Sequence, residues 1–130
     1  MPPDVLGLAG VLLWTSDERH PAMRAFYADT LRMPPRSDRS GFVNFELGEA
    51  RLTVAVHGEV TGPARDPLRI MVNLSVDGLD EMHRRLIDKA VPCLRPPERE
   101  SWGGRVATYT DPDGNVVQLF ELPDSSSDEG

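Results

Sequence analysis

The chain has 130 residues, with fourteen basic and twenty-one acidic side chains and a net charge of −7. Because binding to DNA or RNA needs a basic face that neutralises phosphates, this charge balance argues against a nucleic-acid partner. One cysteine, no secretory signal and no apolar run near the about 18 residues of a membrane span predict a cytoplasmic protein without a membrane partner.

The first half of the chain predicts a strand, a helix and two further strands. Residues 8–16, LAGVLLWTS, are an apolar run of strand length. Asp17 is expected to open a helix that continues to Leu31, with apolar residues at helical spacing. Residues 42–47 predict the next strand, and residues 51–57 alternate apolar and polar side chains as a strand does.

The second half repeats this order. Residues 68–76 predict a strand, and residues 78–90 carry an apolar stripe typical of a helix. Three more strands are expected over residues 91–95, 104–110 and 115–122. The last two are joined by DPDGN, in which proline presets a turn and glycine supplies the positive φ. A duplicated α+β fold follows from this repetition of order.

With these elements the chain resembles the vicinal oxygen chelate superfamily, which includes glyoxalase I, extradiol dioxygenases, fosfomycin-modifying enzymes and the bleomycin-resistance proteins. The resemblance covers about residues 5–122. The matching features are the Asp17-opened helix with Phe26, Tyr27 and Leu31, the stretch Val76–Asp80, the pair Trp102-Gly103, and the turn Asp111–Asn115.

The resemblance implies an α+β fold of two βαβββ modules, with about eight strands and two main helices forming a cup-like sheet around a cavity. We expect one domain over residues 1–122, with module one at about 5–58 and module two at about 68–122. Residues 123–130 are too polar to pack and are expected to form an acidic, disordered tail.

The enzymes of this family hold a divalent metal with His and Glu side chains, and the resemblance assigns those ligands to four positions. Here these positions are Gly10, Thr53, Met71 and Gln118. Glycine offers no ligand, methionine offers a soft thioether, and threonine and glutamine are weak ligands for divalent ions. We therefore expect no metal and no other cofactor.

The remaining candidate ligands and nucleophiles have simpler interpretations. His20, His57 and His83 show no i, i+4 pairing and are expected at the surface. Cys93 has no histidine near it in the pattern and is expected to be a half-buried strand thiol.

Aromatic side chains are the candidates for a ligand site. Trp102 and Phe42 correspond to positions where the bleomycin-resistance branch has aromatic residues that stack on drugs. Other aromatic residues could extend such a wall or could serve only as core; these are Trp14, Phe45, Tyr109 and Phe120.

Arginines give this chain a segment of opposite charge to the groove of the bleomycin-resistance branch, which lines its groove with acids. Arg32, Arg36 and Arg39 make the corresponding segment basic, and they would favour an anionic or neutral planar ligand if they border the cavity. As a solvated face they would carry no such meaning. Arg105 is a candidate for a directed polar contact, with a cross-strand ion pair as the alternative.

We predict a metal-free protein without catalytic residues that sequesters or carries an aromatic metabolite or antibiotic as a homodimer. The predicted ligand-binding residues are Trp102, Trp14, Phe42, Arg105, Gln118, Met71 and Thr53. One alternative is a metal-independent lyase, isomerase or cyclase that uses Arg105, His57, Glu46, Tyr109 or Gln118. A dimerisation or regulatory module is the third possibility.

Overall fold

The structure is a computed structural model that describes residues 4–123. It consists of two compact units, the first extending to Gly62 and the second beginning at Pro63. The predicted tail, apart from Pro123, lies outside the described residues.

The first unit is a four-stranded sheet with one helical segment. Its strands follow the order β1-β4-β3-β2, in which β1 runs parallel to β4 and the other pairs are antiparallel. The helical segment consists of α1 and a π-helical continuation, η1. The elements are β1 (Gly10–Thr15), α1 (His20–Arg24), η1 (Ala25–Thr30), β2 (Ser37–Arg39), β3 (Phe42–Leu47) and β4 (Ala50–Val56).

The second unit has the same topology. Its strand order is β5-β8-β7-β6, again with one parallel pair, β5 and β8. Two βαβββ modules of an α+β fold are therefore confirmed. The elements are η2 (Pro67–Arg69), β5 (Met71–Ser75), α2 (Leu79–Asp88), β6 (Cys93–Arg99), β7 (Arg105–Thr110) and β8 (Val116–Glu121).

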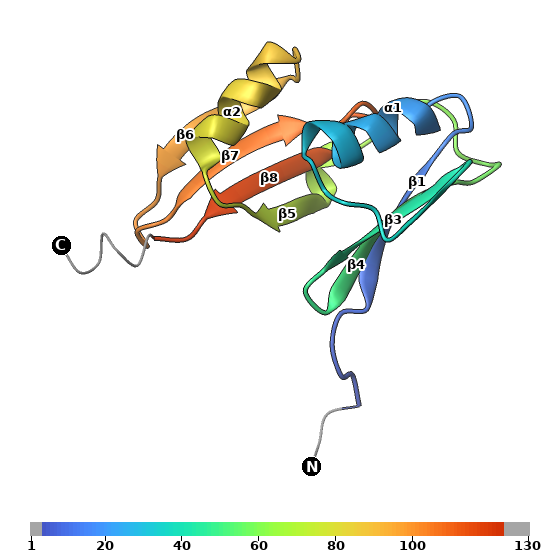
Figure 1. The fold of residues 1–130 in the computed structure, drawn as a ribbon, viewed down its shortest axis with the longest axis horizontal. Helices are drawn as coiled ribbons and strands as arrows, with labels where there is room; N and C mark the ends of the chain where they lie inside the picture. The colour runs from blue at the N-terminus through green and yellow to red at the C-terminus, as the bar shows by residue number, and fades with distance from the viewer. Residues whose placement is uncertain (1–3, 124–130) are drawn as a thin grey trace. The chain divides into compact units, whose positions relative to one another are not determined.

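Each helix covers one face of its own sheet (Figure 1). Since side chains alternate across a strand, one face of each sheet packs on the helix of its own unit and the other points away from that helix. We call the second one the helix-free face. In the first unit, the fully buried Met23 and Tyr27 belong to the helical segment, and the sheet supplies Val43 and Val54. In the second unit, α2 contributes Leu79 and Leu86, and the sheet contributes Val117, Leu119 and Tyr109.

The structure differs from the sequence-based elements in several places, and two of the differences concern the bounds of predicted elements. The first helix begins at His20 rather than Asp17, because the backbone first makes a turn in which Arg19 and His20 donate to the Ser16 carbonyl. β6 continues to Arg99 through Pro96 and Pro97. Proline is tolerated there because β6 is an edge strand with irregular pairing, so the missing N–H groups break few ladder bonds.

None of the helices formed by residues 4–123 is long and apolar enough to cross a membrane.

Candidate functional site

The helix-free face of the first sheet carries aromatic and small polar side chains. The strand register aligns Trp14 with Ala55, Ala55 with Phe42, and Phe42 with Arg39, so these side chains share one face. Thr53 lies two residues before Ala55 on the same face. Trp14 leaves 45% of its surface exposed.

The helix-free face of the second sheet is built in the same way. Met71 on β5 and Gln118 on β8 lie on it, and so does Phe120, two residues beyond Gln118. The Gln118 amide donates to the Asn73 side-chain oxygen at 2.9 Å, across the parallel β5–β8 pair. Trp102 follows β6 and meets the Phe120 ring edge-on, with centroids 6.5 Å apart.

All four positions that the resemblance assigns to metal ligands thus lie on helix-free faces. Gly10 and Thr53 are on the first sheet, and Met71 and Gln118 are on the second. The residue types present do not fit a divalent metal, since they offer no carboxylate and no imidazole. Within residues 4–123, no three His, Cys, Asp or Glu side chains lie close enough together to hold a metal ion.

Position 10 is closed to a side chain by the backbone as well as by its residue type. A Cβ atom there would lie well inside contact distance of the Arg51 carbonyl oxygen on the neighbouring strand β4. A ligand-bearing residue would therefore need β1 to move away from β4, a shift that the β1–β4 hydrogen bonds oppose.

The Gln118 side chain is hydrogen-bonded to a neighbouring residue. Its amide group bonds to Asn73, a residue that the sequence interpretation did not single out. The strand register makes this pair, because Asn73 and Gln118 are direct partners. The alignment of β5 with β8 was the missing information, and a single sequence does not supply it.

Aromatic contacts at the first sheet involve two further polar residues. The Trp14 ring meets His57 edge-on at a centroid distance of 5.2 Å. The Arg39 guanidinium lies over the Phe42 ring, with its carbon atom 4.1 Å from the centroid. Such stacking orients the guanidinium while leaving its in-plane N–H groups available.

Trp102 packs on the second of the two glycines that follow it, Gly104. A Cβ atom at Gly104 would overlap the Trp102 ring, so the indole packs directly on the glycine backbone. About half of the indole surface, 52%, is nevertheless exposed. The WGG sequence therefore fixes a tryptophan against β7 and β8 and keeps it accessible.

Arg105 lies on the other face of the second sheet, towards α2. It makes two hydrogen bonds to Asp80, at 2.6 and 3.1 Å, and an ion pair with Glu121 at 3.7 Å. This is the structural role that the sequence left open as its alternative. The hydrogen bond from Arg105 also holds the pKa of Asp80 below its usual value.

Other aromatic and histidine residues lie between a sheet and its helix. Phe45 is core, and the fully buried Tyr109 hydroxyl bonds to the His83 ring at 2.7 Å. Burial, and next to it the charge of Cys93, raises the pKa of Tyr109. The surface assignment of His20 was wrong, because this residue is 5% exposed and bonds through Nε2 to the Val54 carbonyl.

Cys93 is half-buried on β6, as predicted for a strand thiol. Burial raises the pKa of the thiol, which disfavours the reactive thiolate.

Comparison with known proteins gives consistent matches. The family model of the Glyoxalase/Bleomycin resistance protein/Dioxygenase superfamily matches residues 12–119. YraH of Bacillus subtilis (strain 168) is 25% identical over 109 residues, which cover 75% of this chain and 85% of YraH. A bleomycin resistance protein of Klebsiella pneumoniae is 28% identical over 91 residues, which cover 63% of this chain and 68% of that protein.

Solved structures share the fold. A glyoxalase/dioxygenase from Nostoc punctiforme superposes with a TM-score of 0.78 at 17% identity, over 95% of this chain and 96% of that one. A lactoylglutathione lyase from Agrobacterium tumefaciens gives a TM-score of 0.66 at 21% identity, over 92% and 95% of the two chains. At these identities the likeness concerns the fold, and it confirms the vicinal oxygen chelate architecture.

Proposed function

The chain belongs to the Glyoxalase/Bleomycin resistance protein/Dioxygenase superfamily, and on that premise we propose that it binds a small aromatic metabolite or antibiotic without using a metal. Binding would sequester or carry the molecule. The ligand would contact aromatic side chains on the helix-free faces.

The main support for this proposal is the set of residues at the four positions assigned to metal ligands. Glycine, threonine, methionine and glutamine stand at the four positions that the resemblance assigns to the metal ligands of the superfamily's enzymes. The contact of a Cβ atom at Gly10 with the β4 backbone, and the bond from Gln118 to Asn73, both oppose a ligand role at those positions. A binding function needs none of these ligands.

Exposed aromatic surface supports the choice of ligand. Trp14 and Trp102 are each about half exposed, at 45% and 52%, although both are anchored by neighbours. Rigid aromatic side chains offer large contact area to a planar ligand at low entropic cost. The Klebsiella pneumoniae relative is itself a bleomycin resistance protein, which is consistent with such a use of the fold.

A metal-independent enzyme has less support. Of the side chains considered for that role, Arg105 and Tyr109 face α2 and are engaged there. Glu46 pairs with Arg36 and Arg51, and Gln118 is neutral. General acid–base catalysis needs a positioned titratable group near the substrate, and His57 is the one such candidate left from that set.

The proposal is tested by tryptophan fluorescence of chelator-treated protein. We would titrate it with planar aromatic antibiotics and with bleomycin-type glycopeptides, and determine the metal content of untreated protein. Saturable quenching together with no stoichiometric metal is expected. Stoichiometric zinc, iron or nickel that the untreated protein retains would overturn the metal-free assignment.

Two variants assign the quenching to a sheet. Trp102→Phe leaves Trp14 as the reporter in the first unit, and Trp14→Phe leaves Trp102 in the second. Quenching that persists at equal affinity in one variant identifies the tryptophan near the ligand. Absence of saturable quenching in wild type and both variants would contradict aromatic binding at these faces.

A further inference from the structure

One row of side chains crosses the helix-free face of the first sheet. It consists of Arg39 on β2, Phe42 on β3, Ala55 on β4 and Trp14 on β1, aligned by the strand register. We call these four residues the cross-strand row. A small residue, Ala55, separates the two aromatic ones.

Arg39 is an exposed cation on this row without a carboxylate partner among residues 4–123. Its guanidinium is stacked on Phe42, at 4.1 Å from the ring centroid. Gly41, with φ of 76°, allows the tight turn that brings Arg39 opposite Phe42. The stacking leaves the in-plane N–H fork of the guanidinium free to bind an acid.

Neighbouring arginines, unlike Arg39, are paired with carboxylates. Arg24 forms a bidentate pair with Asp38 on β2, and Arg36 and Arg51 both form ion pairs with Glu46. In a chain with seven more acidic than basic side chains, an arginine held on an aromatic ring rather than on an acid is available for an external anion.

The spacing of the row matches a small aromatic acid. Trp14 and Phe42 lie on strands two apart, so their backbones are roughly 10 Å from each other. Because the Arg39 guanidinium already covers one side of Phe42, a ligand ring would contact the exposed Trp14 indole instead. A fused two-ring system with one carboxylate would bridge from Trp14 to Arg39.

We propose that the cross-strand row binds a planar aromatic carboxylate, with the ring against Trp14 and the carboxylate on Arg39. Phe42 acts as a positioning residue, because it orients the guanidinium. This inference rests on the proposed function and adds the charge of the ligand to it.

His57 supplies a second donor beside Trp14. Its Nδ1 accepts a hydrogen bond from the Glu59 backbone N–H at 3.1 Å, which in the neutral ring leaves the proton on Nε2. The ring also contacts Trp14. A polar substituent on the ligand near the indole would therefore meet an N–H donor.

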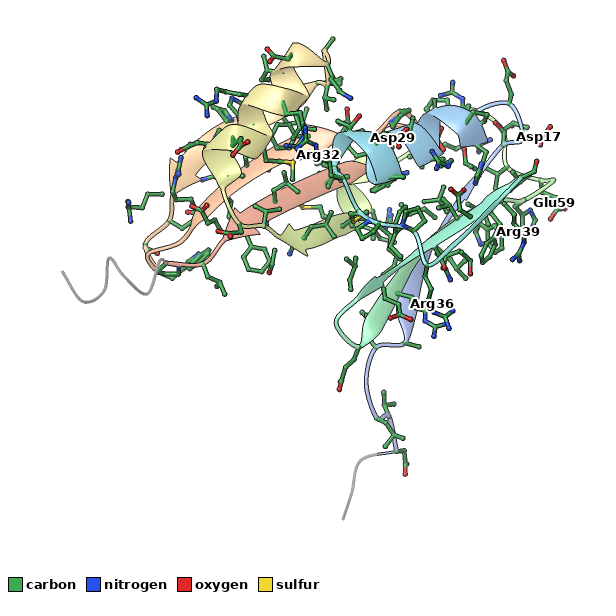
Figure 2. The ribbon with its side chains drawn as sticks, in the orientation of Figure 1. Asp17, Asp29, Arg32, Arg36, Arg39 and Glu59 are labelled. Atoms are coloured by element: carbon green, nitrogen blue, oxygen red, sulfur yellow. The ribbon has the colours of Figure 1, made fainter. Side chains whose placement is uncertain are left out.

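Glu59 is one acidic side chain that opposes this arrangement. It lies in the loop after β4, and Figure 2 shows it at the same end of the first unit as Arg39. Its charge lowers the affinity for an anion by a screened, long-range effect. Glu59→Gln should consequently tighten the binding of a carboxylate and leave a neutral ligand unaffected.

The test uses two matched probes, 2-naphthoate and its neutral amide, 2-naphthamide, measured by titration calorimetry. Wild-type protein is expected to bind the acid at least about tenfold more tightly than the amide, as a charge-assisted hydrogen-bond pair implies. Arg39→Gln should remove this preference, because it weakens the binding of the acid far more than the binding of the amide.

Arg32→Gln is the matched control. It removes the same charge from the same basic segment, and Figure 2 shows Arg32 well separated from Arg39. The preference for the acid should survive in this variant. Phe42→Leu should reduce the preference without abolishing the binding of the amide, and Trp14→Leu should weaken both probes.

Each outcome decides between the two proposals. Equal binding of acid and amide by wild-type protein, or a preference that persists in Arg39→Gln, would overturn the assignment of an anionic ligand to Arg39. Aromatic binding without metal would then still stand. If wild-type protein binds neither probe, the cross-strand row is not a site for an aromatic acid, and if in addition no aromatic antibiotic quenches the tryptophans, both proposals fail.

Discussion

Gly10 is the residue at which backbone geometry bears most directly on the absence of a metal-ligand set. Thr53, Met71 and Gln118 carry side chains that could be exchanged for ligands of similar size. At Gly10 even a methyl group meets the Arg51 carbonyl oxygen, because β1 and β4 approach closely there. The obstacle at this position is steric as well as chemical.

Gly10→Ala is therefore expected to destabilise the protein. Pushing a methyl group into backbone contact costs about 1–3 kcal/mol of unfolding free energy by analogy with overpacked cores. Urea unfolding followed by circular dichroism measures the change. Gly58→Ala is the control, since a Cβ atom there meets nothing within 4 Å and the variant should be unchanged or slightly more stable.

A loss as large in Gly58→Ala as in Gly10→Ala would contradict the steric explanation. The effect would then reflect the glycine-to-alanine change in general.

Helix α2 depends on a carboxylate that comes from a strand. Its N-cap residue, Gly78, has φ of 79° and offers no side chain for capping. Glu121 on β8 replaces that cap, because its carboxylate accepts from the Gly78 and Leu79 N–H groups at 3.1 and 2.8 Å. Arg105 then joins Glu121 to Asp80 in the first turn of the helix.

Glu121→Ala is expected to lower the unfolding free energy by about 1–2 kcal/mol, as the loss of an N-terminal cap does. Glu81→Ala tests whether charge alone matters, since Glu81 also lies in the first turn of α2 but is not hydrogen-bonded there. That variant should differ from wild type by less than about 0.5 kcal/mol. Equal losses in denaturant unfolding would refute a capping role for Glu121.

The elements show which features a single sequence encodes. Residues 42–47 and the repeated order were predictable because local periodicity and turn residues determine them. The short β2, the continuation of β6 through Pro96 and Pro97, and the π-helical η1 were not, since pairing partners and packing decide them. The partners of Arg105, Asp80 and Glu121, were not predictable for the same reason, because they are distant from it in sequence.

At the scale of the whole molecule, the same strand order occurs twice, and each unit has its own helix-covered core. Each unit has its own candidate surface, since its helix covers one face of its sheet. The other face carries Trp14 and Phe42 in the first unit and Met71 and Gln118 in the second. The homodimer, the cytoplasmic location and the enclosing cup stay predictions.

Both units also contain an arginine–aspartate pair that links stability to pH. Hydrogen bonds from Arg24 and Arg105 lower the pKa values of Asp38 and Asp80, respectively. Each carboxylate therefore stabilises the folded state above the pKa of the unfolded chain, about 3.9. That stabilisation is lost as the pH falls through the lower folded-state pKa values.

The urea midpoint is therefore expected to fall as the pH is lowered from 7 to about 3, because aspartates of the unfolded chain take up protons near their ordinary pKa of about 3.9 while Asp38 and Asp80 resist protonation in the folded state. Asp38→Asn and Asp80→Asn should each have a lower midpoint than wild type at pH 7 and show a smaller fall on acidification. Asp29→Asn is the control, because the Asp29 carboxylate makes only a long contact with Arg24, 3.5 Å between its Oδ2 and Arg24 Nη1. If all three variants fall as much as wild type, the paired carboxylates are not what makes stability depend on acid.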